Sequence, residues 1–358
     1  MAVVVLALAA LASASPAEAI VGGGAAAPGR WPWMAAVLDA GAPDAASGQF
    51  CGGVVIGRRR VLTAGHCAVD VRTRDIDVLV GRTRLSEGQG RRLPVTAISV
   101  FPGFVNGDQA GLDAAVLTLG ADIGIAPVAL ARPGQDAAWA PGTPAWTMGW
   151  GALNARRSPG GSRYYADRLH ELQLPVQGDD ACENAFGRGW IDFPYRPAWL
   201  LCAGTAAGDT GPCNGDSGGP LVVGPPGAWL DVGILSGGDS CVARGYFDVY
   251  ARVDRISDFA LSAALTVQPD PLARPRVVGR AVAGALVRCR RGRWRGSPAH
   301  FSVRWTRRGA PAGAVIGGGA THRLSARDAH SGVSCAVTAA NRGGHVTVVA
   351  TPLRPRAG

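Results

Sequence analysis

The sequence predicts an all-β protein with two β-barrels, followed by a smaller β-sandwich. Short apolar runs alternate with turns, and the chain supplies 52 glycines and 25 prolines for such turns. The pattern occupies residues 20–135 and is repeated over residues 140–253. Many short strands between glycine- and proline-rich turns are typical of barrels and sandwiches. With 358 residues, the chain has room for two or three such domains.

Residues 1–19 predict a secretory signal peptide. The run from Val3 to Ala12 is apolar but short for a membrane span, and Ala17-Glu18-Ala19 offers an Ala-x-Ala cleavage site. No positive charge precedes the apolar run, so either the true start lies upstream or the signal is weak. No later stretch is long and apolar enough to span a bilayer. We therefore expect a secreted, extracellular protein without a membrane span.

Ten runs are expected to form strands of the two barrels, and a helix follows them. The runs lie at residues 33–38, 53–56, 76–80, 95–100, 114–119, 145–148, 172–176, 220–223, 232–235 and 249–253. Asp254 is expected to cap a helix that continues to Leu265, with its apolar side chains on one face. A proline-rich linker over residues 267–275 then marks a domain boundary.

Residues 276–358 predict a separate Ig-like β-sandwich with a basic surface. Strand-like runs lie at residues 281–289, 300–306, 333–339 and 345–351. Cys289, Trp305 and Cys335 follow the Cys…Trp…Cys order of immunoglobulin-like sandwiches, although Val333 replaces the usual tyrosine. The segment resembles the small bacterial Ig-like modules appended to secreted enzymes. From residue 270 onward, 16 arginines face two aspartates, a net charge of +14, whereas residues 1–269 carry −4.

Three residues far apart in the sequence carry the chemistry of nucleophilic hydrolysis. Ser217 lies in Gly215-Asp216-Ser217-Gly218-Gly219-Pro220, where the glycines allow a tight turn and the close approach of a substrate carbonyl. A serine needs a base, and His66 follows a strand-like run and precedes a cysteine. Asp113 begins an apolar run, where a carboxylate is costly unless paired, so it suits the acid that orients the base. The N–H groups of Gly215 and Ser217 are expected to form the oxyanion hole. His170 belongs to no motif and is interpreted as a surface or packing histidine.

Together these motifs resemble the trypsin/chymotrypsin family of serine proteases. Residues 63–67 read TAGHC, residues 112–119 read LDAAVLTL and residues 215–220 read GDSGGP, in the family's order of His, Asp and Ser. IVGG from Ile20 resembles the mature N-terminus, and GWG from Gly149 resembles the start of the second barrel. The resemblance implies two antiparallel six-stranded β-barrels with a C-terminal helix, forming a protease domain over residues 20–266.

The resemblance also implies an activation pair and a set of disulfides. A freed Ile20 ammonium would pair with Asp216, and because Ala19 precedes Ile20, we hypothesise that signal cleavage itself yields the active N-terminus. Ser236 would hydrogen-bond Asp113. The implied disulfides are Cys51–Cys67, Cys182–Cys202 and Cys213–Cys241, which leaves Cys289–Cys335 in the tail. Complete pairing of eight cysteines favours an oxidising compartment.

The specificity pocket implied by the resemblance contains Gly211, Ser236, Gly238 and Asp248. Gly211 stands six residues before Ser217, where an aspartate would signal cleavage after basic residues. Asp248 on the opposite wall offers a carboxylate instead, so we favour basic side chains with relaxed selectivity. The alternative is that Asp248 points away or that the register is shifted by one. Most relatives have tryptophan where Gly237 stands.

We therefore expect a secreted, monomeric serine endopeptidase that acts on proteins or peptides through an acyl-enzyme. No cofactor and no required metal are expected. The alternative is a catalytically inactive homologue that acts as a binding protein. The basic tail is either a module that binds anionic surfaces weakly or a solvated spacer, which is the favoured interpretation, and no specific nucleic-acid motif is visible.

Overall fold

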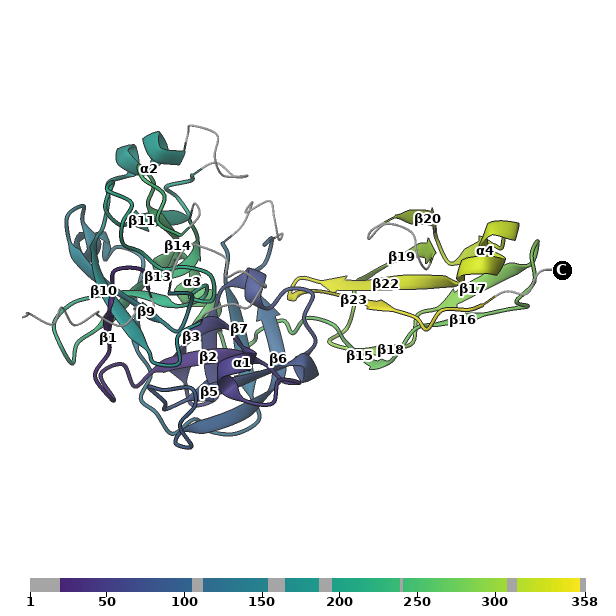
Figure 1. Ribbon diagram of the computed structural model, residues 1–358, viewed down its shortest axis with the longest axis horizontal. Helices are drawn as coiled ribbons and strands as arrows, with labels where there is room; N and C mark the ends of the chain where they lie inside the picture. Colours follow the sequence, from purple (N-terminus) through teal and green to yellow (C-terminus); the bar gives the residue numbers. More distant parts are fainter. Residues whose placement is uncertain are drawn as a thin grey trace, which may run out of the picture.

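The computed structural model describes residues 20–104, 112–153, 165–186, 195–238, 241–307 and 314–354. The predicted signal peptide at residues 1–19 lies outside the described residues. The described chain is mostly strand, with short helices, and forms a larger body followed by an elongated C-terminal tail (Figure 1). None of its described helices is long and apolar enough to cross a membrane.

The first half of the larger body is a closed six-stranded barrel. Its strands are joined in the order β2-β3-β4-β7-β6-β5. Their bounds are β2 (Met34–Asp39), β3 (Gln49–Gly57), β4 (Arg60–Thr63), β5 (Ile76–Val80), β6 (Arg91–Val100) and β7 (Ala115–Leu119). A short helix, α1 (Ala45–Gly48), separates β2 from β3 and is capped by Asp44. Alternating small and branched apolar residues fill the barrel interior.

The second half is an eight-stranded sheet. Its order is β1-β10-β9-β12-β13-β14-β11, with β8 pairing in parallel to β13. The bounds are β1 (Gly24–Ala25), β8 (Ala129–Leu130), β9 (Pro144–Gly149), β10 (His170–Pro175), β11 (Leu200–Ala203), β12 (Pro220–Val223), β13 (Leu230–Gly237) and β14 (Asp248–Arg252). Among the described residues, one isolated bridge, between Val176 and Ala203, links the end of β10 to β11. The expectation of a second closed six-stranded barrel is therefore not confirmed.

Two helices accompany the second sheet, α2 (Asp179–Phe186) and α3 (Val253–Leu261). The prediction that Asp254 caps α3 is wrong, because the cap is Arg252 and Asp254 lies in the first turn. There its buried carboxylate forms ion pairs with Arg252 and Arg255. The helix ends at Leu261, four residues before the expected end at Leu265, and Ser262 is its C-cap.

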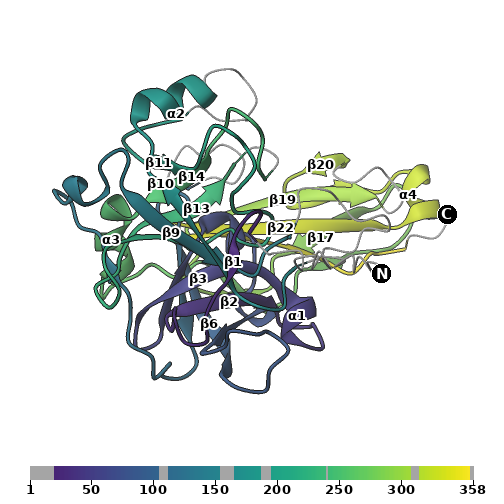
Figure 2. The same cartoon turned by 60° about the vertical axis from the view of Figure 1, so that its left-hand side comes forward.

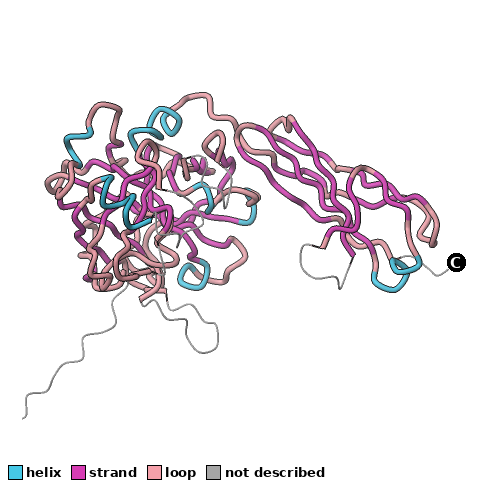
Figure 3. The backbone as a smooth tube through the Cα atoms, turned by 90° about the horizontal axis from the view of Figure 1, so that it is seen from above, coloured by secondary structure: helices cyan, strands magenta, loops and turns pink. Residues whose placement is uncertain are grey.

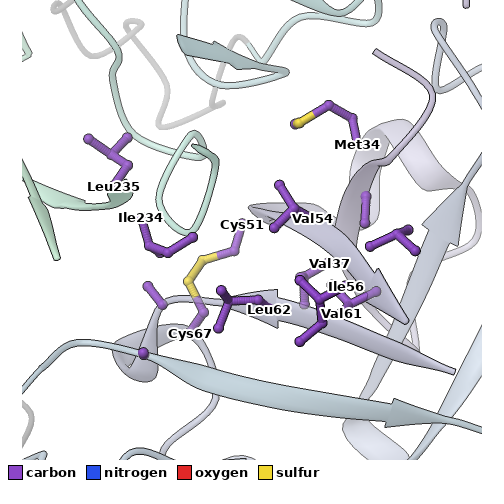
Figure 4. Packing of buried hydrophobic residues seen from close by; sticks show 14 of the residues in the cluster. Met34, Val37, Cys51, Val54, Ile56, Val61, Leu62, Cys67, Ile234 and Leu235 are labelled. Carbon is purple, nitrogen blue, oxygen red and sulfur yellow. A yellow bond between two sulfur atoms is a disulfide. The ribbon is translucent and has the colours of Figure 1, made fainter. Parts of the chain in front are cut away.

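The barrel and the second sheet share one hydrophobic core. Figure 4 shows the Cys51–Cys67 disulfide beside Leu62 and Ile234, which come from β4 and β13 respectively. Core residues of the two halves therefore pack together near the end of β4, which His66 follows.

The tail contains three sheets and one short helix. They are β15–β18, β16–β17–β21 and β20–β19–β22–β23, with α4 (Ala326–Ser331) before β22. The bounds are β15 (Asp270–Ala273), β16 (Arg276–Val278), β17 (Leu286–Arg290), β18 (Arg293–Arg295), β19 (His300–Arg307), β20 (Val315–Gly318), β21 (Thr321–Arg323), β22 (Val333–Asn341) and β23 (Gly344–Val349). The Cys289–Cys335 disulfide ties β17 to β22, and Trp305 is fully buried in the same small core.

The segment expected to be a linker is fixed against the barrel. Gln268 is buried, its backbone N–H donates to the Ile98 carbonyl at 2.8 Å, and its side-chain Nε2 donates to the Val71 carbonyl at 2.6 Å. Thr73 donates its hydroxyl to Asp270 at 3.0 Å. Residues 270–273 form β15 rather than a free chain, because these partners satisfy the backbone and side-chain groups locally.

The hairpin of β22 and β23 adds a second attachment. Figures 1 and 2 show that it extends toward the larger body, and Figure 3 shows the strand-rich tail beside that body from above. Val100 donates its N–H to the Gly343 carbonyl at 2.8 Å, and Asp70 donates its N–H to the His345 carbonyl at 2.9 Å. Thr347 donates its N–H back to the Asp70 carboxylate. We call this attachment, together with the contacts of Gln268 and Asp270, the docking joint.

Candidate active site

The site is built around the buried carboxylate of Asp113. Its Oδ1 accepts a hydrogen bond from the His66 backbone N–H at 2.8 Å, and its Oδ2 lies 2.7 Å from His66 Nδ1. Ser236, on β13 of the second sheet, donates its hydroxyl to the same Oδ2 at 2.6 Å. Asp113 is 2% exposed, so three donors surround a carboxylate that has little access to water. One carboxylate thus fixes the imidazole and links the two halves of the body.

Two local features of the chain position His66. It lies in a 3₁₀ helix, Gly65–Cys67, directly after β4. Cys67 is tied to Cys51 on β3 by a disulfide. Burial acts to lower the pKa of His66, but the charge of Asp113 and the hydrogen bond that its carboxylate accepts outweigh this effect and leave the pKa raised above 6.5. The ring is therefore a base whose protonated form is stabilised by its partner.

Ser217 lies in a loop that is packed against β3 and β4. Gly52 on β3 donates its N–H to the Ser217 carbonyl at 2.7 Å. Gly218 has a φ of +81°, and a β-carbon there would lie 2.3 Å from Thr63 Oγ1, so only glycine fits. Within the described part of the chain, the Ser217 hydroxyl forms no hydrogen bond with His66. Catalytic hydrogen bonds are often long in free enzymes and tighten when the substrate binds.

The two candidate oxyanion-hole residues have backbone N–H groups without a protein acceptor in the described residues. Gly215 has a φ of +95°, and a β-carbon would lie 3.0 Å from the Tyr165 ring. Gln49, buried at the start of β3, donates its Nε2 to the Gly215 carbonyl at 2.8 Å. This contact fixes the peptide group between Gly215 and Asp216, which adjoins the one that carries the Gly215 N–H. Sequence reasoning missed Gln49, since a glutamine two residues before a cysteine carries no motif.

Asp216 is a buried carboxylate that forms no ion pair within the described residues. Its oxygens accept hydrogen bonds from the N–H groups of Gly151 at 2.7 Å and Cys213 at 2.9 Å. Burial raises its pKa to about 7. β-Carbons at Gly149 or Gly151 would lie within 2.4 Å of the carboxyl group, which explains both glycines of the GWG motif. Ile20 is fully buried, and Val21 forms a bridge with Gly211, five residues before Asp216.

A cavity of about 280 Å³ adjoins Ser217 and contains the predicted pocket residues Ser236, Gly238 and Asp248. Asp248 is part of its lining. A β-carbon at Gly211 would lie 2.7 Å from Asp248 Oδ2, and one at Gly238 would lie 3.0 Å from Oδ1. The carboxylate therefore fills the space that a side chain at residue 211 would need. Burial, together with the charge of Asp216, holds the pKa of Asp248 well above its usual value.

The cysteines are joined in the pairs named above. The four disulfides are Cys51–Cys67, Cys182–Cys202, Cys213–Cys241 and Cys289–Cys335. Among the described residues, the one cluster of potential metal ligands is Cys51, His66 and Cys67, and its disulfide leaves no thiolate to bind a metal ion. His170 is buried outside the site, with Nδ1 2.8 Å from the Arg168 carbonyl.

Comparison with known proteins shows which family this chain resembles. Residues 20–260 match the family described as Trypsin. The chain is 39% identical over 210 residues to a protein named Trypsin from Saccharopolyspora erythraea, covering 59% of this chain and 85% of that protein. It is 31% identical over 252 residues to mouse serine protease 28, covering 67% and 87%. It is also 35% identical over 251 residues to human serine protease 56, covering 67% of this chain but 38% of that protein. The chain belongs to the trypsin family.

Proposed function

We propose that this protein is a serine endopeptidase that hydrolyses peptide bonds through an acyl-enzyme. The observation that carries the proposal is the Asp113 carboxylate, held at 2.7 Å from His66 Nδ1 and at 2.6 Å from the Ser236 hydroxyl. A buried acid that orients an imidazole in this way enables the imidazole to act as the base for a nearby hydroxyl. Ser217, in a loop bonded to Gly52, is that hydroxyl.

The reaction proceeds in two halves. His66 Nε2 removes the Ser217 proton while Oγ attacks the scissile carbonyl, and the N–H groups of Gly215 and Ser217 stabilise the oxyanion. His66 then gives the proton to the leaving amine, which breaks the peptide bond and leaves an ester on Ser217. Water, deprotonated by His66, releases the acid product. Because His66 must be neutral to act and its pKa is raised, activity falls as the pH drops through that raised pKa.

Covalent labelling tests the proposal against the rival hypothesis of an inactive homologue that only binds proteins. A fluorophosphonate probe should modify Ser217 stoichiometrically, and peptide mapping by mass spectrometry should locate the adduct there. Modification should disappear after heat denaturation, since it needs His66 as the base. Absence of labelling on folded protein that begins at Ile20 would favour the binding-protein hypothesis.

The buried Asp248 supports a preference for basic side chains, with relaxed selectivity. A carboxylate in the lining of the pocket is able to form a charge-assisted hydrogen bond with a guanidinium or ammonium group. Above Gly237 the chain has open space where a larger side chain would form an apolar wall. An open wall and an acidic lining together suit more than one side-chain class.

Replacing Asp248 with glycine is expected to lower kcat/KM for arginine substrates about 10- to 100-fold and to leave leucine substrates nearly unchanged, because one charged hydrogen bond is lost. Paired peptides that differ only at the residue before the cleaved bond provide the measurement. The Arg/Leu ratio of the unmodified enzyme should rise with pH, since only ionised Asp248 holds a cation and its pKa is raised. Asp209→Gly, an exposed position, is the control. An unchanged arginine preference in Asp248→Gly would remove the pocket assignment.

Gln49 is proposed as a positioning residue for the oxyanion hole. Gln49→Leu removes the buried donor to the Gly215 carbonyl, so kcat should fall about 10-fold, the value of one net hydrogen bond. KM should change little, because the contact holds the loop whose N–H groups act in the transition state. Gln89→Leu, at an exposed position, should have wild-type kinetics. A rise in KM at constant kcat would show that Gln49 supports substrate binding rather than the oxyanion.

We also propose the domain organisation and the cellular location. Residues 20–266 would form the protease, residues 267–275 the connection, and residues 276–358 an Ig-like sandwich, as the Cys289–Cys335 disulfide beside buried Trp305 supports. Four disulfides support passage through an oxidising compartment, and with it secretion after removal of residues 1–19.

A further inference from the structure

The tail carries a hollow whose lining is dominated by arginine. Its volume is about 1150 Å³, and it lies where β16, β17 and the chain around β18 meet β19. Six arginines line it, and we call the site the arginine hollow: Arg274, Arg276, Arg288, Arg290, Arg291 and Arg293. All six are exposed. An arginine-biased composition explains many arginines, but it does not explain why six of them meet around one hollow.

The charges of the arginine hollow are not compensated by the protein. Within the described residues, none of the six side chains forms a hydrogen bond or an ion pair. The two acids of the tail are engaged elsewhere. Asp270 pairs with Arg295 at 2.6 Å, and Asp328 pairs with Arg307 at 2.7 Å. The six exposed arginines that line the hollow therefore have no carboxylate partner among the described residues.

The strand register brings like charges face to face. Arg276 on β16 stands directly opposite Arg290 on β17, and Arg288 lies on the same face two residues further along. Like charges in directly opposed positions destabilise an antiparallel pair. The two arginines of β17 are about 6.6 Å apart along the strand. Folding alone gains nothing from this arrangement, whereas a ligand with repeated negative groups would turn it into an attractive one.

Two aromatic side chains at the border of the hollow exclude recognition of a ligand by base stacking. The Arg291 guanidinium lies 4.3 Å from the centre of the Phe301 ring, and Trp294 meets the same ring edge-on at 6.0 Å. Trp294 also donates its indole N–H to the Arg291 carbonyl at 2.8 Å. Because Phe301 is already covered, it is not a free platform on which a nucleobase would stack. The ligand is therefore recognised through its charges rather than through rings.

We propose that the arginine hollow binds an extended chain that carries several phosphate groups. The planar fork of arginine matches phosphate oxygens in pairs, and each phosphate offers more acceptors than a carboxylate does. The hollow is too large for one phosphate, and its six cations suit several phosphates in a row. Inorganic polyphosphate and the backbone of a phosphodiester polymer share this chemistry. The proposal is independent of proteolysis, since no residue of the hollow belongs to the Asp113 site.

Titration calorimetry of the full chain tests this proposal. The probes are inorganic polyphosphate, single-stranded oligothymidylate and polyglutamate of matched charge. The hollow variant is Arg276→Gln/Arg288→Gln/Arg290→Gln. Its control, Arg280→Gln/Arg304→Gln/Arg327→Gln, removes the same charge from exposed tail positions outside the hollow. The melting temperature of the hollow variant should be unchanged or raised, because the repulsion between Arg276 and Arg290 is relieved.

Polyphosphate is expected to bind the unmodified chain and the control variant with similar affinity. Both should bind it at least about 10-fold more tightly than the hollow variant does. The plot of log Kd against log salt concentration should have a slope smaller by about 2 for the hollow variant. Weaker binding of polyglutamate would support phosphate as the recognised group. Equal affinity per phosphate for oligothymidylate would identify backbone phosphodiesters as a source, and weaker binding would point to polyphosphate. Equal losses in the hollow and control variants, or tighter binding of polyglutamate, would overturn the proposal.

Discussion

Ser217→Ala is expected to lower kcat by about 10⁶-fold toward peptide substrates, because the nucleophile, its base and its acid act as one unit. Substrate binding should survive, since the pocket around Asp248 keeps its walls. The measurement is single-turnover cleavage of a peptide with a chromogenic leaving group. The melting temperature should be almost unchanged, because the substitution removes one hydroxyl from a loop that is held in place by backbone hydrogen bonds.

Two further serine variants define the contrast. Ser236→Ala removes a hydrogen bond to the Asp113 carboxylate and should lower kcat only about 10- to 100-fold. Ser302→Ala, exposed on β19 of the tail, should leave kcat unchanged. If Ser217→Ala kept more than a few per cent of wild-type activity, another residue would have to supply the nucleophile, and the proposed mechanism would fail.

Release of Ile20 should raise activity about 10²- to 10³-fold. In the longer chain Asp216 is a buried acid without an ion pair in the described residues, and removing one partner of a buried ion pair typically costs 3–5 kcal/mol. A new ammonium at Ile20 would supply the missing charge and order the neighbouring Gly215 and Ser217 loop. The test places a specific protease site directly before Ile20 and measures kcat/KM before and after cleavage. Asp216→Asn should abolish the gain.

The same carboxyl group gives a pH test of that idea. In the uncleaved chain its pKa is raised from 3.8 to about 7, so the folded state holds this proton more tightly than the unfolded state does. Stability is then full below about pH 4 and falls by about 4 kcal/mol as the pH rises to 7. Denaturant unfolding of the two forms should show this loss in the uncleaved chain and much less of it after cleavage. Active secreted protein that begins at a residue other than Ile20 would contradict the pairing.

Short-range signals made the centre of the site predictable. A serine between glycines, a histidine beside a cysteine and an aspartate at the head of an apolar run each have a chemical reason that is visible in a few residues. The strand runs were predictable for the same reason, since alternation and turn residues are local. Gln49 was not, because its importance comes from a contact with Gly215, 166 residues away.

The connection between the protease and the tail shows why composition misleads at boundaries. Three prolines and charged residues around residue 270 predicted a linker, but Gln268 and Asp270 find partners at Ile98, Val71 and Thr73 on a distant part of the chain. The predicted cap of the helix near Asp254 was wrong for a different reason, because ion pairs with the neighbouring Arg252 and Arg255 place that acid inside the first turn. Contacts distant in the sequence decided the first case, and contacts close in the sequence decided the second.

The docking joint has a mechanical consequence. Asp70, four residues beyond His66, is bonded to backbone groups of His345 and Thr347, so the tail is held against the barrel. If the tail is bound to a surface, the Asp113 site would therefore be held at a fixed distance from that surface and in a fixed orientation. Peptide segments at that distance would reach the site most readily, so position above the surface would select among them in addition to the preference of the pocket.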